Sequence, residues 1–133
     1  MGGTLHPEIR DLPGRMNHRM SPDGTLDEKF ALSHLVRLSP GSPFIRIFGR
    51  DEVLVNSLHG QGIEEPGRRV VIEGYAPDGT AEAMTIEGAP GFAMAVQWHP
   101  EYNAALDAVS RPLFETFGDA LLAWKHGAAT AAE

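Results

Sequence analysis

The feature that most constrains the fold is a pair of extended runs joined by a tight-turn sequence. Val70 to Ala76 and Ala81 to Glu87 are rich in residues that favour strands, and Pro77-Asp78-Gly79-Thr80 separates them. Proline fixes its own φ, and glycine tolerates a positive φ, so this tetrapeptide can reverse the chain. The sequence therefore predicts a β-hairpin over residues 70–87.

Regular elements are also predicted upstream of the hairpin. Residues 31–38 alternate well enough to form a strand, one face of which would carry Leu32, His34, Val36 and Leu38. Residues 52–56 contain Val-Leu-Val, which is typical of a short buried strand. Between them, Ser42 is a suitable N-cap and Pro43 a suitable first helical residue. A short helix should therefore begin there and end at Gly49.

Downstream of the hairpin we expect one more strand and a helix. Residues 92–98 form an apolar run suited to a strand buried on both faces. Residues 103–126 have helical spacing of apolar side chains, and Phe117 and Trp124 should pack this helix onto the sheet. Because proline cannot continue a helix without losing a hydrogen bond, we expect a break or kink just before Pro112.

The order of these elements indicates an α/β protein with an incomplete sheet, more like the second half of a domain than a whole one. Residues 1–29 show little periodicity, which indicates either a functional loop or a segment whose packing partner is missing. We assign residues 1–126 to one partial domain. The Ala-rich residues 127–133 are expected to be a disordered tail.

Composition excludes several functions. The chain has 18 acidic residues against 11 Lys and Arg and a formal net charge of −7, which argues against nucleic acid or an anionic membrane as the main partner. It has no cysteine, so it offers no disulfide, thiolate metal site or cysteine nucleophile of its own; this fits a reducing cytoplasm. No signal peptide and no apolar run near the ~20 residues of a membrane helix is present.

The strongest chemical signal is His99, which directly follows the apolar run at residues 92–98 and precedes Pro100 and Glu101. An imidazole at the end of a central strand can act as a general base because its pKa lies near neutrality. A nearby carboxylate can bind the far ring nitrogen and fix the tautomer. Taken alone, His-x-Glu is better explained by a strand-end histidine beside an unrelated acid.

The wider context resembles a known family. Val96-Gln97-Trp98-His99-Pro100-Glu101 is similar to the motif of class I glutamine amidotransferase-like enzymes, which have a flavodoxin-like open sheet and a Cys-His-Glu triad. The closest likeness is to the γ-glutamyl-γ-aminobutyrate hydrolase group, peptidase family C26. The likeness runs from residue 2 to about residue 120, and its other matching stretches are Gly2-Gly3-Thr4-Leu5-His6, Val55-Asn56-Ser57-Leu58-His59-Gly60-Gln61, Ala76-Pro77-Asp78-Gly79 and Glu82-Ala83.

The resemblance implies specific roles. His99 would be the general base and Glu101 the acid that orients it. The nucleophilic cysteine of the family precedes the Gly-Gly-Thr-Leu stretch, so its strand-to-helix elbow would lie upstream of Met1, as would the oxyanion-hole donors. The implied reaction is hydrolysis of a γ-glutamyl amide through a cysteinyl thioester, for which no metal or organic cofactor is needed.

Asn56, His59 and Gln61 are interpreted as residues that line the substrate pocket. Ser57 and His59 could be read as a Ser–His pair, but Ser57 lacks the Gly-x-Ser-x-Gly elbow of a nucleophile. Many family members have a second histidine where this chain has Gly60. This difference from the family pattern bears on which substrate the pocket would bind.

The other histidines do not predict a metal site. His6, His18 and His34 lie in irregular sequence without His-x-x-x-His spacing, so no zinc site is expected. His18 beside Asn17 and Arg19 could line a pocket, but a surface loop is the favoured interpretation.

Two functions are therefore in competition. The first is a γ-glutamyl amide hydrolase homologue that is inactive by itself, because its base has no cysteine to activate, and that needs another polypeptide to supply the N-terminal half. The second is a non-catalytic truncated relative that acts as an interaction or oligomerising module, since an exposed half-sheet favours self-association.

Overall fold

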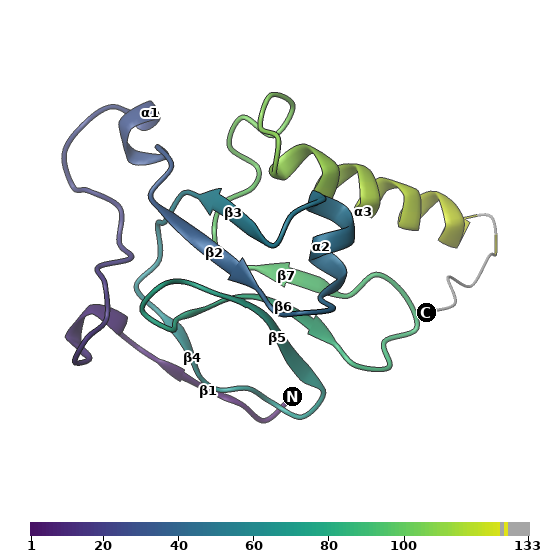
Figure 1. Cartoon of the computed structure of the whole chain (residues 1–133), viewed down its shortest axis with the longest axis horizontal. Helices are drawn as coiled ribbons and strands as arrows, with labels where there is room; N and C mark the ends of the chain where they lie inside the picture. The colour runs from purple at the N-terminus through teal and green to yellow at the C-terminus, as the bar shows by residue number, and fades with distance from the viewer. Residues whose placement is uncertain (126, 128–133) are drawn as a thin grey trace.

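A computed structural model describes residues 1–125 and 127, and its centre is an open five-stranded sheet (Figure 1). The sheet order is β3-β2-β5-β6-β7, and every strand pair in the described residues is antiparallel. A separate two-stranded sheet pairs β1 with β4. The bounds are β1 Thr4–His6, β2 His34–Leu38, β3 Glu52–Val55, β4 Gly62–Glu65, β5 Val70–Tyr75, β6 Ala81–Ile86 and β7 Met94–Val96.

The predicted hairpin is confirmed as β5 and β6. At its turn the Gly79 amide donates to the Ala76 carbonyl at 2.9 Å, and Gly79 has a φ of 81° that glycine adopts without strain. Asp78 accepts a hydrogen bond from the Thr80 amide at 3.0 Å, so the turn residues satisfy one another. This turn directs Asp78 back toward the body of the protein, where it contacts the N-terminal segment.

The elements before the hairpin also form as predicted. In β2, His34, Val36 and Leu38 are buried while the residues between them are exposed. Helix α2, Pro43–Phe48, begins at Ser42, whose hydroxyl accepts from the Phe44 amide at 3.2 Å. It ends at Gly49 in the left-handed region. Leu32, placed by the pattern on the buried face, precedes the strand and is exposed.

The hydrophobic core lies between the sheet and helices α2 and α3, the latter spanning Ser110–Lys125 (Figure 1). Both helices lie over the same side of the sheet, where they contact each other. The buried members of this core are Val36, Leu38, Phe44, Phe48, Val53, Val55, Ala83, Trp98, Val109 and Leu113. The α/β architecture with a β-hairpin and a C-terminal helix is thus confirmed.

The prediction of a doubly buried strand at residues 92–98 is wrong. Only Met94–Val96 form β7, Ala95 is exposed, and its neighbours in the strand are half-buried. The reason is position: β7 pairs only with β6, so it is an edge strand with no neighbour on its other side. Leu54 in β3 is exposed because it alternates with the core residues Val53 and Val55 and faces away from the core.

The helix predicted over residues 103–126 is shorter than expected, and the break predicted near Pro112 is found as the start of the helix. Helix α3 begins at Ser110, so Pro112 lies in the first turn, where its missing N–H is not needed. Residues 101–109 form turns, and the Asp107 carboxylate accepts from the Ser110 amide at 2.6 Å. Phe117 packs on Phe92, with ring centroids 5.4 Å apart, as predicted. Trp124 is 74% exposed, which contradicts its predicted packing on the sheet.

The N-terminal segment packs against the rest of the chain. Its β1 pairs with β4, and Ile9 in the 3-10 helix η1, Ile9–Asp11, is 2% exposed. Helix α1, Leu26–Lys29, begins with a capping box between Thr25 and Glu28. The hydrogen bonds that the Glu28 carboxylate accepts from the Thr25 amide and hydroxyl lower the Glu28 pKa. Residues 1–29 therefore have packing partners within this chain.

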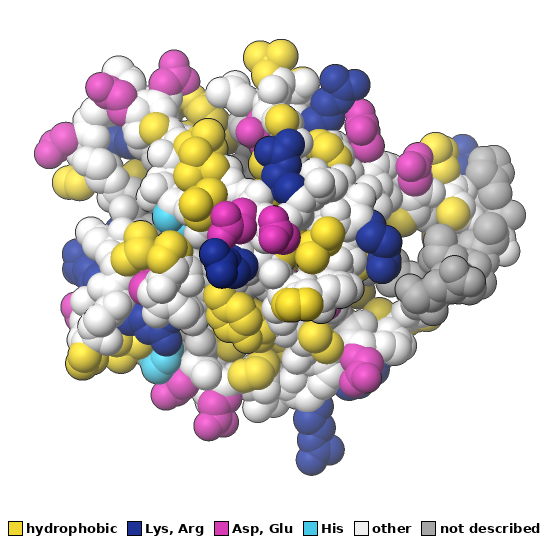
Figure 2. All heavy atoms as spheres, in the orientation of Figure 1, with side chains coloured by type: hydrophobic (Ala, Val, Ile, Leu, Met, Phe, Trp, Pro, Cys, Tyr) yellow, Lys and Arg dark blue, Asp and Glu magenta, His cyan; other side chains and the backbone are white. Residues whose placement is uncertain are grey.

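Within the described residues, no helix is long and apolar enough to cross a membrane. On the face shown in Figure 2, Lys and Arg side chains are scattered among acidic and apolar ones. The tail predicted at residues 127–133 lies outside the described residues except for Gly127, as does His126.

Candidate active site

The structure brings His99 and Glu101 together just beyond β7. His99 Nδ1 lies 2.6 Å from Glu101 Oε1, and the side chains are 42% and 60% exposed. Although partial burial alone would raise the Glu101 pKa, the hydrogen bond from His99 and its charge bring that pKa below its ordinary value. The carboxylate is therefore ionised at neutral pH and can hold the Nδ1–H tautomer. That tautomer leaves Nε2 free to accept a proton.

Asn56 holds the backbone of His99 from the end of β3. Its Nδ2 donates to the His99 carbonyl at 2.9 Å, and its Oδ1 accepts from the His99 amide at 2.8 Å. The Asn56 side chain is almost fully buried, so both bonds are protected from water. Asn56 was predicted to line the substrate pocket; it lines the cleft described next, its amide also supports the backbone of His99, and contact with substrate stays a prediction.

A shallow cleft lies beside this pair. Trp98 forms part of it from the core side, and Phe30 and Tyr102 form another part. The Phe30 and Tyr102 rings stack with centroids 4.2 Å apart, and the Phe30 and His99 rings meet edge to face with centroids 5.8 Å apart. Tyr102 donates a short hydrogen bond to Asp27, which raises the Tyr102 pKa. The segment around α1 therefore forms one wall near His99.

His59 points away from that pair and into the protein. Its Nδ1 lies 2.8 Å from the Gln61 carbonyl, and its Nε2 lies 3.3 Å from Glu82 Oε1. In the part of the chain that the structure describes, no hydrogen bond or ion pair joins His59 to His99. The Gln61 side chain is exposed, and the pocket-lining roles of His59 and Gln61 stay predictions.

The place beside Gly60 is occupied by Arg19. A Cβ built on Gly60 would lie 2.7 Å from the Arg19 guanidinium. Any side chain at position 60 would therefore require the Arg19 side chain to move. Arg19 is held there by Glu8, with Nε 2.8 Å from Oε2. The hydrogen bond and the charge of Arg19 lower the pKa of the Glu8 carboxyl despite the opposing effect of burial. The departure from the family pattern at Gly60 thus coincides with an arginine beside it.

Sequence reasoning missed a buried polar cluster around Glu82. The favoured prediction of a surface loop for His18 is wrong, because His18 is 2% exposed and contacts Asp78, Ser57 and Glu82. Glu82 is completely buried in β6. The one available signal was a carboxylate inside the otherwise apolar run of that strand.

Hydrogen bonds keep the two carboxylates of this cluster ionised. Desolvation would raise the Asp78 pKa, but the amides of Met16 and Thr80 and the ring of His18 drive it far below its ordinary value. Burial would raise the Glu82 pKa, but the hydrogen bond with His59 and the His34 imidazole 3.3 Å away lower it. His59 responds in the opposite direction: burial favours its neutral form, yet Glu82 and the Gln61 carbonyl raise its pKa.

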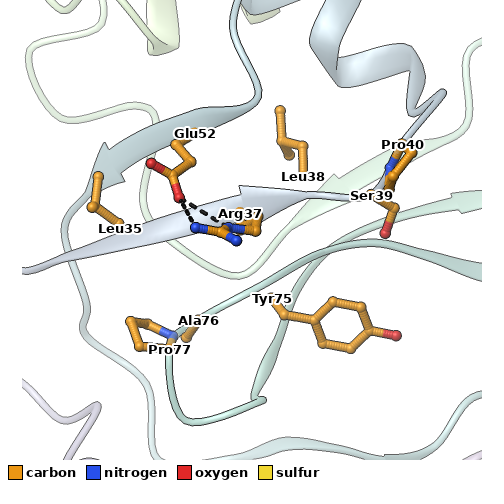
Figure 3. A pocket seen from close by; sticks show the side chains of 9 residues that line it. All are labelled: Leu35, Arg37, Leu38, Ser39, Pro40, Glu52, Tyr75, Ala76 and Pro77. Carbon is orange, nitrogen blue, oxygen red and sulfur yellow. Dashed lines mark hydrogen bonds and ion pairs between the residues drawn. The ribbon is translucent and has the colours of Figure 1, made fainter.

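A further hollow on the surface, drawn in Figure 3, is lined by none of the candidate site residues His99, Glu101, Asn56, His59 and Gln61. It lies across β2 and β5, and an exposed ion pair between Arg37 and Glu52, at 2.7 Å, crosses it. Leu35, Tyr75 and Pro77 supply apolar surface. Exposed ion pairs of this kind stabilise proteins little, and the hollow offers no acid–base pair for chemistry.

The mixed α/β fold with its C-terminal helix is consistent with the glutamine amidotransferase-like class. The family model described as Peptidase C26 matches residues 1–101, and the chain belongs to this family. The match includes both His99 and Glu101.

Curated relatives carry more specific names. The chain is 38% identical over 126 residues to the gamma-glutamyl-gamma-aminobutyrate hydrolase of Shigella flexneri, covering 94% of this chain and 48% of that protein. It is 38% identical over 117 residues to the gamma-glutamyl-gamma-aminobutyrate hydrolase PuuD of Escherichia coli. That alignment covers 87% of this chain and 46% of PuuD. A putative glutamine amidotransferase of Mycobacterium tuberculosis is 30% identical over 118 residues, covering 83% and 36%. The chain thus spans about half the length of its first relatives or less.

Proposed function

We propose that this chain supplies the base and its orienting acid to a cysteine-dependent γ-glutamyl amide hydrolase. The 2.6 Å contact between His99 Nδ1 and Glu101 Oε1 carries the proposal, since it leaves Nε2 as the proton acceptor. The name shared by the Shigella and Escherichia relatives supports a γ-glutamyl amide, such as γ-glutamyl-γ-aminobutyrate, as substrate.

The chemistry requires a thiol from another segment. His99 Nε2 would take the proton of that thiol as its sulfur attacks the γ-amide carbonyl. The imidazolium would then give the proton to the leaving amine, which departs and leaves a γ-glutamyl thioester. His99 would next take a proton from water as the water attacks the thioester; glutamate is released and the thiol is re-formed by return of the proton. Glu101 stabilises the imidazolium in both halves of the reaction.

The nucleophile must come from elsewhere because the chain contains no cysteine. We infer that the chain alone is inactive, and that its partner is a polypeptide carrying the family's cysteine half. A second copy of the chain is the other partner considered, whereas nucleic acid and membrane are not expected with a net charge of −7. A cytoplasmic location remains part of this proposal.

The experiment compares the purified chain alone with the chain mixed with the cysteine-containing half of the Escherichia coli relative. γ-Glutamyl-γ-aminobutyrate hydrolysis is followed by glutamate release. We expect no turnover by either part alone and turnover by the mixture. Substituting the cysteine of the added half by alanine is the control. Turnover with that control, or with this chain alone, would show that the nucleophile is not the one proposed.

An exposed apolar row on α3 favours the second function, an interaction module. Leu121, Leu122 and Trp124 are 53%, 57% and 74% exposed, and apolar side chains this exposed commonly mark contact surfaces. Light scattering measures the molar mass in solution. A dimer that becomes a monomer when Leu121→Ser and Trp124→Ser are combined supports self-association through α3. A monomer at all concentrations would argue against it.

A further inference from the structure

Three imidazoles converge on one oxygen of the buried Glu82 carboxylate. His18 Nδ1 lies 3.4 Å from Oε1, and the Nε2 atoms of His34 and His59 each lie 3.3 Å from the same atom. All four side chains are at most 8% exposed. They come from four separate parts of the chain: the N-terminal segment, β2, the segment after β3, and β6.

The outer contacts of two histidines show which ring nitrogen faces the carboxylate. His18 Nε2 lies 2.9 Å from Asp78 Oδ2 and carries a proton, while Nδ1 faces both Ser57 Oγ at 3.2 Å and Glu82 Oε1 at 3.4 Å. His59 Nδ1 lies 2.8 Å from the Gln61 carbonyl, so it carries the proton and leaves Nε2 toward Glu82. Lone pairs that face a carboxylate oxygen repel it unless a proton or a metal ion lies between them.

We propose that His18, His59 and Glu82 form a binding site for a divalent transition metal of the zinc class. Their ligand atoms all lie within 4.8 Å of one another. Zinc binds imidazole nitrogen and carboxylate oxygen at about 2.0–2.1 Å, so neighbouring ligands of a tetrahedral site lie about 3.3–3.4 Å apart. The nitrogen-to-oxygen separations of 3.3 and 3.4 Å match that edge.

His34 lies beside this group of three and faces the same carboxylate oxygen, with Nε2 3.3 Å from Glu82 Oε1. Neither of its ring nitrogens has a hydrogen-bond partner in the structure, although the side chain is only 3% exposed, and the same is true of Glu82 Oε2. Buried polar atoms are rarely left without a partner, because the lost solvation is not recovered. A metal ion would satisfy His34 Nε2, and contacts to Asp78 and to the Gln61 carbonyl are the supporting bonds that metal-bound histidines usually make.

Binding at this site differs from the hydrolase chemistry in both residues and role. The site contains neither His99 nor Glu101, and it joins the N-terminal segment to β2 and β6. Without metal, a proton shared by His59 and Glu82 would occupy the space between them. A metal ion must displace that proton, so its affinity should rise with pH.

The test uses the purified full chain, freed of metal with a chelator. Zn²⁺ is titrated against a chromophoric chelator, and Co²⁺ is titrated separately as a spectroscopic probe. We expect one equivalent of each ion and the intense visible absorption of four-coordinate Co²⁺. His59→Gln and Glu82→Gln should each weaken Zn²⁺ binding more than tenfold, and Asp78→Asn about 10–100-fold.

His6→Gln is the matched control, because His6 lies 3.9 Å from Glu64 and outside the cluster. It should bind metal as the unchanged chain does. Failure of the unchanged chain to bind one equivalent, or equal affinity in His59→Gln and His6→Gln, would overturn the proposal and leave a proton-only network. Circular dichroism checks that each variant is folded. If the cluster variants unfold, the Co²⁺ spectrum of the unchanged chain decides: six-coordinate absorption or no saturation refutes the site.

Discussion

At the scale of single residues, the candidate base is held in two independent ways. Glu101 fixes the ring of His99 through Nδ1, and Asn56 fixes its backbone through both polar groups of the peptide. The ring contact is exposed to water, whereas the Asn56 amide is buried. Glu101 therefore orients the imidazole ring, whereas Asn56 fixes the position of the His99 backbone.

This separation predicts the effect of Asn56→Ala. The change removes two hydrogen bonds and leaves the His99 N–H and C=O without their partner, so the free energy of unfolding should fall by about 1–3 kcal/mol. Urea denaturation measures it. Asn17→Ala is the control, since Asn17 is exposed and accepts only from the Arg19 amide; it should change stability by less than about 0.5 kcal/mol. Equal effects of the two changes on the free energy of unfolding would refute the claim that Asn56 holds the His99 backbone.

The buried cluster predicts how the stability of the metal-free chain depends on pH. Folding raises the His59 pKa, so its contribution is complete below the ordinary value of 6.5 and is lost as pH rises through the folded value. Folding lowers the Glu82 pKa, so its contribution is complete above 4.5 and is lost as pH falls through the folded value. These two groups therefore favour maximal stability between pH 4.5 and 6.5.

Thermal unfolding of the metal-free chain across pH tests this dependence. His59→Gln should lose stability overall and should also flatten the decline of Tm above pH 6.5, whereas His6→Gln should keep the decline. A decline that is unchanged in His59→Gln would show that another group is responsible.

At the scale of elements, α2 and the hairpin form where local chemistry specifies them. Gly49 ends α2 with a φ of 67°, and a Cβ there would meet no atom within 4 Å. The effect of Gly49→Ala should therefore come from the backbone alone, a loss of about 1 kcal/mol.

Gly118→Ala is the matched comparison. Gly118 lies inside α3, and a Cβ there also meets nothing within 4 Å, so alanine should stabilise the chain by about 0.5–1 kcal/mol. Chemical denaturation should thus give opposite signs for the same substitution. The same sign for both would contradict the role assigned to the left-handed cap.

The elements that sequence predicted correctly are those with local signals. The caps at Ser42 and Gly49 and the turn at Gly79 act over a few residues, so the pattern alone finds them. The edge position of β7 could not be predicted, because it depends on which strand is its neighbour. The pairing of β1 with β4 was missed for the same reason, since about sixty residues separate Thr4 from its partner Glu65.

The contacts at the candidate sites were likewise predictable only where the residues are close in sequence. His99 and Glu101 are two residues apart, so their contact follows from a turn at Pro100. The cluster at Glu82 draws on His34, whose burial the alternation with Val36 and Leu38 predicts, and on His18, which has no neighbour in sequence that indicates burial. His18 is fixed by Asp78, 60 residues away, and only the three-dimensional structure brings them together.

At the scale of the whole molecule, the chain is a folded unit, and under the proposed function it carries part of a reaction centre. The core between the sheet and its two helices positions the base, and the family match extends over that region. The relatives are about twice as long, and the chain contains no cysteine. The central claim is therefore that His99 serves a thiol carried by another segment.

The most direct measurement joins this chain to the cysteine-containing half of the Escherichia coli relative in one polypeptide and follows glutamate release from γ-glutamyl-γ-aminobutyrate. We expect turnover in the fusion and a loss of about 10²–10⁴-fold or more in His99→Ala, because general-base catalysis contributes at least that much. His6→Ala should keep full activity, since His6 lies in β1. Equal turnover by the His99→Ala and His6→Ala fusions would contradict the claim that His99 is the base.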